Sequence, residues 1–161
     1  MEDEIPKHNH DREVDGDLLI RRLEVTDKSK GFLKVLSQLS PCDSISDSEF
    51  LTQFSLICSH GDDHVIAVVE DRKSGKIVAT GSVFVEKKFI HGCSKVGHIE
   101  DVVVDRESRG KKLGQMVLNY LVEHAKKMDC YKVILDSLVD TAGFYKKNGF
   151  VEKDVHLVMY F

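Results

Sequence analysis

The sequence predicts an α/β domain built on a mixed sheet, not a uniform alternation of strands and helices. Strand and helix patterns follow in the order strand, two helices, three strands, helix, strand, helix, strand. The most regular helix pattern, residues 110–128, directly follows an apolar strand. A chain of 161 residues can bury the core of one domain. We interpret residues 1–16, which are acidic and polar, as a disordered tail and residues 17–161 as the folded domain.

Composition argues against several classes of protein. The hydrophobic share of 42% and charged share of 31% are ordinary for a soluble domain, and the net charge of -4 disfavours general nucleic-acid binding. No apolar run approaches the roughly 20 residues that span a bilayer. The four cysteines lack Cys-x-x-Cys spacing, which predicts reduced thiols and no zinc site. We therefore expect a cytoplasmic protein that binds no nucleic acid, holds no metal and has no membrane span.

The first third of the chain contains one strand and two helix patterns. Residues 18–23 are predicted to form the first strand. Thr26 or Asp27 can cap a helix, which Pro41 ends. The apolar positions of this helix are Phe32, Val35, Leu36 and Leu39. Ser46 and Glu49 form a capping-box pattern for the second helix.

The middle of the chain is predicted to form a hairpin followed by a further strand. Residues 65–69 and 77–85 are predicted strands, joined by a turn at 71–75. Gly81 interrupts the second of them, which predicts a bulge or a close backbone approach. The next strand spans 98–104.

After the long helix at 110–128, the pattern predicts three shorter elements. Residues 131–136 form a strand and 142–148 a short helix, with Gly149 as a left-handed cap. A last strand is expected within 150–161.

Two chemical features meet where the 98–104 strand leads into the long helix. Glu100 and Asp101 interrupt the apolar strand, and buried acids need a partner, so they predict either a ligand site or a structural salt bridge. The loop Arg109–Gly114 opens the helix. Unpaired amides and the positive end of the helix dipole make such a loop suited to a phosphate or pyrophosphate.

Four segments in order resemble the GCN5-related N-acetyltransferases. Arg109, Lys112 and Gly114 fall on positions one, four and six of that family's Gln/Arg-x-x-Gly-x-Gly/Ala loop, with Lys112 replacing the usual first glycine. Segments 88–91, 98–104 and 130–136 followed by 143–150 resemble the eukaryotic branch that acetylates glucosamine 6-phosphate for UDP-N-acetylglucosamine synthesis. The similarity covers about residues 17–155. It implies a mostly antiparallel mixed sheet with a splayed strand pair, flanked by helices, with acetyl-CoA as acetyl donor and a homodimer.

The resemblance also assigns roles in acetyl-CoA binding and catalysis. It implies that the main chain of the second half of the strand pairs with the pantetheine arm and that the loop cradles the pyrophosphate. The implied acetyl-CoA contacts are Val102, Val103, Val104, Arg109, Gly110, Lys111, Lys112, Leu113, Gly114, Thr141, Phe144, Tyr145 and Lys146. Glu100 would fix sugar hydroxyls and Asp101 would place the amine, while Tyr145 would protonate the departing thiolate. The amide of Val102 is the candidate oxyanion donor.

A third group is implied to bind the anionic sugar phosphate. Its members are Ser37, Lys88, Phe89, Ile90, His91, Glu100, Asp101, Val102, Tyr131, Lys132 and Asp136. Relatives use an arginine near the C-terminus for this phosphate, but residues 156–161 contain none. Two other functions stay open at this point: acetylation of another amine, in a protein or polyamine, and a non-catalytic acyl-CoA-binding module.

Overall fold

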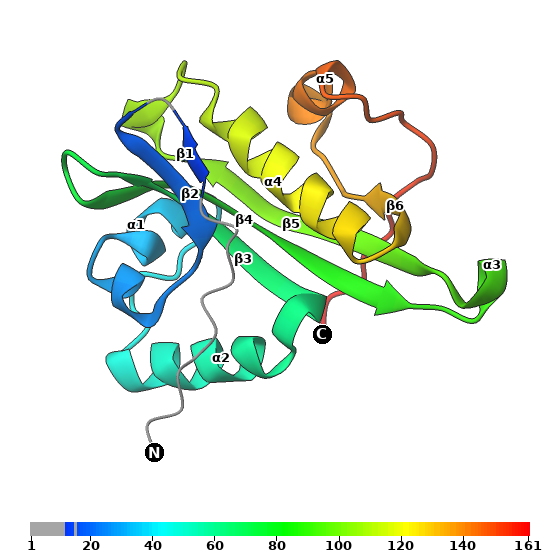
Figure 1. The fold of residues 1–161 in the computed structure, drawn as a ribbon, viewed down its shortest axis with the longest axis horizontal. Helices are drawn as coiled ribbons and strands as arrows, with labels where there is room; N and C mark the ends of the chain where they lie inside the picture. The colour runs from blue at the N-terminus through cyan, green and yellow to red at the C-terminus, as the bar shows by residue number, and fades with distance from the viewer. Residues whose placement is uncertain (1–11, 15) are drawn as a thin grey trace.

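The computed structural model describes residues 12–14 and 16–161. They form one six-stranded sheet in which the strands are neighbours in chain order (Figure 1). All pairs are antiparallel except β5 and β6, which run parallel. The strands are β1 (Arg12–Val14), β2 (Leu18–Arg22), β3 (His64–Asp71), β4 (Lys76–Lys87), β5 (Lys95–Val104) and β6 (Cys130–Ile134). The predicted mixed, mostly antiparallel sheet is therefore confirmed.

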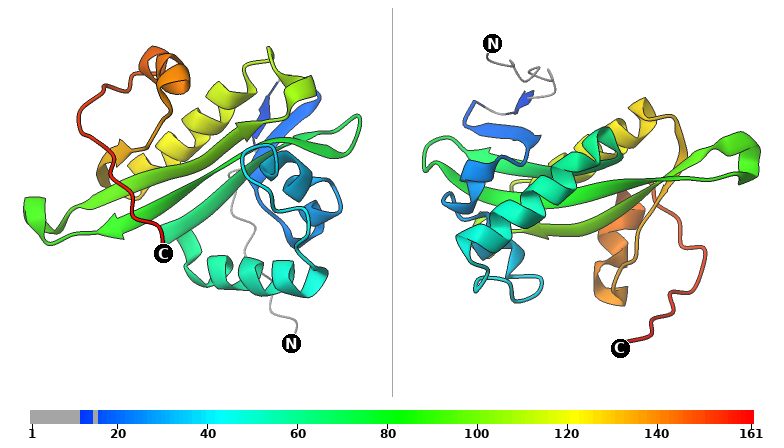
Figure 2. Two further views of the ribbon diagram at one scale, coloured as in Figure 1. Left: turned by 180° about the vertical axis from the view of Figure 1, so that it is seen from behind. Right: turned by 90° about the horizontal axis from the view of Figure 1, so that it is seen from below.

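Helices cover both faces of the sheet (Figures 1 and 2). Helix α4 (Leu113–Lys127) packs on one face through Val117, Leu118 and Leu121. On the other face, α1 (Phe32–Leu36) and α2 (Asp47–Ser59) enclose a second core around Phe32 and Phe50. The remaining helical segments are η1 (Val25–Lys28), η2 (Gly61–Asp63), α3 (Ile90–Cys93), η3 (Arg106–Ser108) and α5 (Val139–Lys147). The site described below lies where β5 leads into α4.

The predicted cap of the second helix is confirmed. The Ser46 hydroxyl accepts a hydrogen bond from the Glu49 amide (3.3 Å), and the Ser46 amide donates to the Glu49 carboxylate (2.8 Å). The predicted first helix is wrong in its extent, because Gly31 at φ +91° separates η1 from α1. A backbone in that left-handed conformation interrupts the helix, so Asp27 belongs to the separate 3-10 turn.

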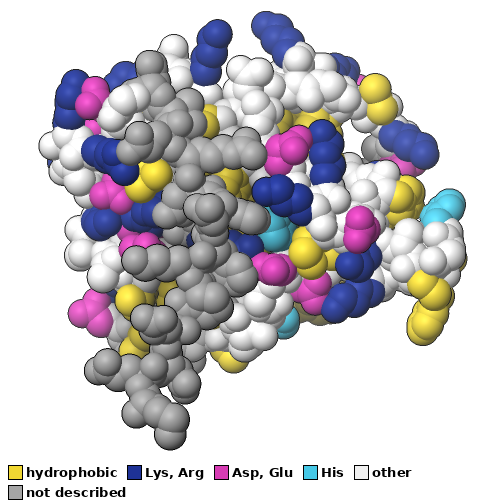
Figure 3. All heavy atoms as spheres, in the orientation of Figure 1, with side chains coloured by type: hydrophobic (Ala, Val, Ile, Leu, Met, Phe, Trp, Pro, Cys, Tyr) yellow, Lys and Arg dark blue, Asp and Glu magenta, His cyan; other side chains and the backbone are white. Residues whose placement is uncertain are grey.

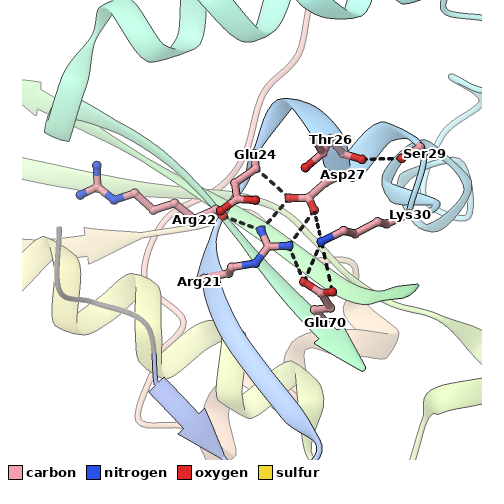
Figure 4. Close-up of polar contacts among 8 residues, drawn as sticks. All are labelled: Arg21, Arg22, Glu24, Thr26, Asp27, Ser29, Lys30 and Glu70. Carbon is pink, nitrogen blue, oxygen red and sulfur yellow. Dashed lines mark hydrogen bonds and ion pairs between the residues drawn. The ribbon is translucent and has the colours of Figure 1, made fainter. Parts of the chain in front are cut away.

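Asp27 is fully buried and belongs to a cluster of four charged side chains (Figure 4). Both its carboxylate oxygens accept hydrogen bonds from the Arg21 guanidinium at 2.7 Å, and one also accepts from the Glu24 amide at 2.8 Å. Glu70 on β3 contacts Arg21 and also Lys30, at 3.1 Å. The opposite charges raise the pKa of Arg21 and lower that of Glu70, with Arg21 as the largest favourable partner of Glu70. The cluster fastens η1 to the sheet.

Both ends of the chain differ from the predicted outline. Arg12–Val14 form β1 beside β2, so strand structure begins before residue 17, and residues 1–11 and 15 of the predicted tail lie outside the described residues. The strand predicted within 150–161 is wrong: residues 150–161 adopt no regular structure. The apolar side chains from Val155 to Phe161 are largely exposed except for a partly covered Val158 (60% exposed). An apolar segment alone does not form a strand, because it must also pair with a neighbour, and residues 150–161 do not pair with the outer edge of β6.

Charge on the surface is mixed. On the face shown in Figure 3, basic and acidic side chains are interspersed outside the grey atoms. Several pair directly, such as Lys126 with Glu123 and Lys146 with Glu152, each at 2.8 Å. Within the described part of the chain, no helix has the length and apolar character needed to cross a membrane.

Candidate active site where strand β5 leaves strand β6

Strand β5 is paired on one side along its length and on the other side only at its start. It pairs with β4 from Lys95 to Val104, but with β6 only from Lys95 to His98. Beyond His98 the two parallel strands diverge, and no described strand occupies that edge up to Val104 (Figure 1). The open edge leaves main-chain N–H and C=O groups available to an extended, amide-containing ligand. The expected splayed strand pair is thus confirmed.

A bulge lies within this open stretch. Thr80 pairs with Val103 and Ser82 with Glu100, so Asp101 and Val102 together oppose Gly81. Asp101 takes up the extra length with φ +52°, a left-handed conformation that aspartate tolerates better than most residues. The irregularity predicted at Gly81 is confirmed, with the extra residue on β5.

Gly81 also permits a close approach between the sheet and α4. A Cβ atom at this position would lie 2.8 Å from Val117 Cγ1 and 3.2 Å from both Leu121 Cδ1 and Val102 Cγ2. Real Cβ atoms do not come that close to carbon, so only glycine fits without a shift of the helix. The bulge and the helix are therefore held together at the start of the open edge.

Acidic side chains gather beside the bulge. Glu100 and Asp101 are exposed, and Asp136, just after β6, lies close enough to influence Glu100. Burial is the largest cause that raises the pKa of Glu100, and the negative charges of Asp136 and Asp101 add to it. The Asp136 carboxylate lies 2.9 Å from His156 Nδ1. These three predicted acids therefore lie together, with no described lysine or arginine paired to them.

The loop Arg109–Gly114 leads into the start of α4 with two left-handed residues. Gly110 and Lys112 adopt left-handed conformations, at φ +84° and +58°, and Lys112 caps α4. The first intrahelical hydrogen bond runs from the Met116 amide to the Lys112 carbonyl (3.0 Å), so the amides of residues 113–115 point out of the helix end. Arg109, Lys111 and Lys112 are exposed around them. Leu113 is buried in the core, which leaves only its main chain for a ligand.

Helix α5 places Tyr145 near the same helix end. Phe144 lies against α4, since a Cβ on Gly114 would be 3.2 Å from Phe144 Cζ. Tyr145 is half-buried against Phe144 and Phe150, with ring centroids 5.0 and 6.0 Å away. Burial raises the pKa of the Tyr145 phenol, which keeps it protonated and able to donate.

Two of the implied acetyl-CoA contacts on α5 are engaged in local bonds. The Thr141 hydroxyl donates to the Leu138 carbonyl (3.1 Å) and lies 2.9 Å from the Ser137 hydroxyl. Lys146 pairs with Glu152. Both side chains therefore stabilise the start and end of their own helix.

The structure does not bring the implied phosphate-binding residues to the acids within one chain. Phe89, Ile90 and His91 lie at the far tip of the β4–β5 hairpin, and Phe89 is 95% exposed. His91 packs on Tyr131 (4.9 Å between ring centroids), and the Lys132 ammonium lies 5.5 Å from that ring. Lys95, at the base of the tip, precedes Glu100 by five residues of β5, a distance of about 17 Å along the strand.

Lys88, at the base of the same tip, forms an ion pair with an acidic residue of β4. Its ammonium pairs with Glu86 at 2.8 Å, and the other Glu86 oxygen lies 2.8 Å from His98 Nε2. Both cations lower the pKa of Glu86, with the Lys88 hydrogen bond as the largest cause. The predicted phosphate-binding cations thus form their own group on the tip and the start of β6.

Ser37 also lies apart from the acids. It follows α1, and its hydroxyl accepts a hydrogen bond from the Cys42 amide at 3.2 Å. It lines a surface pocket of about 450 Å³ together with Gln38, Lys34 and Arg106. Gln38 could not be predicted as a functional residue, because its side chain bonds to Asp105 and Arg106, which lie 67 and 68 positions further along the chain, and no local pattern signals so distant a contact.

Comparisons with known proteins agree with this geometry. The model of the acetyltransferase (GNAT) family matches residues 32–150. The chain is 54% identical over 142 residues to the glucosamine 6-phosphate N-acetyltransferase of Arabidopsis thaliana, which covers 88% of this chain and 95% of the relative. It is 40% identical over 141 residues to the Candida albicans enzyme of that name, covering 88% and 94%.

Solved structures show the same relationship. The crystal structure of the Arabidopsis thaliana glucosamine-6-phosphate N-acetyltransferase matches with a TM-score of 0.88 and 53% identity, covering 89% of this chain and 98% of that one. An acetyltransferase of Trypanosoma brucei matches with a TM-score of 0.83 and 34% identity, covering 90% and 100%.

Proposed function

Because the chain belongs to the acetyltransferase (GNAT) family, and within it to the glucosamine 6-phosphate N-acetyltransferases, we propose a role for each part of the site in that reaction. The protein transfers the acetyl group of acetyl-CoA to the 2-amine of glucosamine 6-phosphate, releasing N-acetylglucosamine 6-phosphate and CoA. The open edge of β5, running from the acids to the loop of α4, is the observation that carries the assignment of roles.

Acetyl-CoA binds along this edge in the proposed arrangement. The main chain of Val102–Val104 pairs with the pantetheine amides, as an added strand would. The pyrophosphate rests on the outward-pointing amides at the start of α4, flanked by Arg109, Lys111 and Lys112. Val102 and Val104 pack toward α4 while Val103 packs toward α1, so their side chains belong to the core and their main chain to the ligand.

The amine acceptor sits at the bulge. Asp101 holds the amine and Glu100 and Asp136 bind sugar hydroxyls, because carboxylates accept hydrogen bonds from both groups. The unprotonated amine attacks the thioester carbonyl directly, and a main-chain carbonyl or water takes the amine proton. The Val102 amide stabilises the negative charge that develops on the thioester oxygen. The C–S bond then breaks, and Tyr145 donates a proton to the departing thiolate.

Two copies of the chain complete the site in this proposal. The cations of the hairpin tip are too far from the acids of their own chain to hold a phosphate beside them. The exposed apolar segment from Val155 to Phe161 is a suitable surface for a partner, since monomers rarely expose such runs. A homodimer would cover this segment and bring one chain's tip to the other chain's acids. We place the dimer in the cytoplasm and assign it no metal.

Mixing two inactive variants tests the dimer. Chains with Asp101→Asn lack the amine contact, and chains with Lys132→Met lack a cation. If the cation comes from the partner, half of the randomly mixed dimers contain one intact site, which restores about a quarter of the wild-type rate. No recovery after mixing and re-equilibration would contradict a shared site.

The release of CoA thiol tests the function itself. The assay compares glucosamine 6-phosphate, glucosamine and a lysine peptide as acceptors at equal concentration. Release that depends on the phosphorylated sugar is the predicted result. Release only with the peptide would indicate a protein acetyltransferase, and CoA binding without release on any amine would indicate a non-catalytic module.

A further inference from the structure

A single side chain joins α1 to the turn that follows β5. The Gln38 amide nitrogen Nε2 donates a hydrogen bond to Asp105 Oδ1 at 2.6 Å, and its oxygen Oε1 accepts one from the Arg106 main-chain amide at 3.0 Å. Gln38 is itself fixed, since its main-chain amide bonds to the Val35 carbonyl at 3.1 Å and its side chain is half-buried.

The chemistry of the two partners determines the orientation of this carboxamide. A main-chain N–H can only donate and an ionised carboxylate can only accept, so the oxygen must face Arg106 and the nitrogen must face Asp105. Of the common side chains of this length, only glutamine supplies both groups. Glutamate lacks the donor, and methionine lacks both.

The turn that Gln38 holds leads directly into the phosphate loop. The second oxygen of Asp105 lies 3.4 Å from the Ser108 hydroxyl, and the Ser108 amide donates to the Asp105 carbonyl at 2.9 Å. The Asp105 amide in turn donates to the Val78 carbonyl on β4, also at 2.9 Å. Asp105 therefore connects the sheet, the Arg106–Ser108 turn and the segment that follows α1. Arg109, the first residue of the phosphate loop, comes directly after this turn.

We propose that Gln38 is a positioning residue for acetyl-CoA: it holds the Asp105–Ser108 turn so that the amides at the start of α4 are aligned for the pyrophosphate. The proposal rests on the proposed function only in taking residues 109–114 as the pyrophosphate site. It links the pyrophosphate loop to the segment that follows α1 and carries Ser37.

Gln38→Met tests the proposal, because methionine keeps the length of the side chain and loses both hydrogen bonds. The dissociation constant of CoA, measured by calorimetry, and the KM for acetyl-CoA are expected to rise about 5- to 10-fold, the scale of one ordinary hydrogen bond. The kcat at saturating acetyl-CoA should stay within about twofold, the pattern of lost uniform binding. Gln53→Met is the matched control: Gln53 is exposed on α2. An unchanged CoA affinity in Gln38→Met, or an equal loss in Gln53→Met, would overturn the proposal.

Gln38→Glu provides a pH dependence of CoA binding that would be absent if Gln38 only stabilised the fold. At neutral pH the new carboxylate would face Asp105, whereas at lower pH one shared proton would restore a donor. The CoA dissociation constant of Gln38→Glu, divided by that of Gln38→Met, should therefore fall between pH 8 and pH 5.5. Lys28, Lys34, Asp43 and Arg106 line the same pocket and are common to both variants, so their titration cancels. A ratio that does not change with pH would overturn the proposal.

These measurements separate the two proposals. A wild-type protein that binds CoA but does not acetylate glucosamine 6-phosphate would refute the function, and the CoA affinities would still decide the role of Gln38. A wild-type protein that fails to bind CoA would refute the pyrophosphate site and the role of Gln38 with it.

Discussion

Replacing Gly81 with alanine places a methyl group where the bulge meets α4. That methyl carbon would lie 2.8 Å from Val117 Cγ1, and Val117 is a fully buried, β-branched side chain that cannot swing aside within its helix. The backbone of Gly81 is not left-handed, so the cost is steric alone. Overpacking of this kind costs about 1–3 kcal/mol. In a domain of this size that lowers the melting temperature by about 5 °C.

The same contact predicts a functional effect. The methyl would also lie 3.2 Å from Val102 Cγ2, so relief of the clash displaces the strand whose main chain we assign to pantetheine. CoA affinity, measured by calorimetry, should therefore fall together with the melting temperature measured by circular dichroism. Gly143→Ala is the matched control for stability, because no atom lies within 4 Å of its added methyl. Alanine inside α5 should raise stability by about 0.5–1 kcal/mol.

A double-mutant cycle isolates the contact. Val117→Ala removes the atom that the new methyl strikes, so Gly81→Ala should cost less in the Val117→Ala background than in the wild type. Strict additivity, or a Gly81→Ala protein that melts within about 1 °C of the wild type and binds CoA equally well, would refute the steric argument.

Three further predictions concern single side chains. Asp27→Ala leaves the buried Arg21 with Glu70 as its remaining acidic partner and should cost about 3 kcal/mol in urea unfolding, the low end for a broken buried pair; a loss below about 0.5 kcal/mol would contradict the cluster's role. Tyr145→Phe should lower kcat by about 100-fold, the low end for a general acid, with CoA affinity and melting temperature unchanged, since only the proton donor is lost; an equal kcat would exclude Tyr145 as the acid. Burial and neighbouring acids raise the pKa of Glu100 in the folded protein. Ionised Glu100 therefore lowers the free energy of unfolding as the pH rises through that pKa. Glu100→Gln should therefore raise the melting temperature at pH 7.5, with a gain that disappears at about pH 4, while it lowers acetyl transfer; a gain of equal size at both pH values would exclude the charge as its cause.

Local sequence signals predicted the local features well. The capping box of Ser46 and Glu49 involves atoms three residues apart, so its pattern is visible in the chain. The irregularity at Gly81 could also be predicted, because a glycine inside an apolar strand typically marks a bulge or a close backbone approach. The phosphate loop was predicted from its position at a helix start and from the family resemblance, although Lys112 stands where the family's pattern has glycine. In the structure Lys112 adopts the left-handed conformation that glycine would favour.

Features that depend on distant partners could not be predicted from the sequence. Arg21, Asp27 and Glu70 come together only when β2 and β3 pair, and Gln38 reaches Asp105 across 67 residues. The predicted last strand failed for the same reason, because its apolar pattern says nothing about whether the segment pairs with the outer edge of β6. Likewise, residues of the hairpin tip match the family in sequence, but the length of β5 separates them from Glu100 in one chain.

We expect CoA to lie along the open edge of β5 and on the start of α4. Amide chemical shifts of the isotope-labelled protein, followed as CoA is added, would locate it. The largest changes should fall on residues 102–104 and 110–115, with small changes at Gln53 and the rest of α2. Changes centred on the pocket beside Ser37 and Lys34, with the β5 edge unaffected, would contradict it.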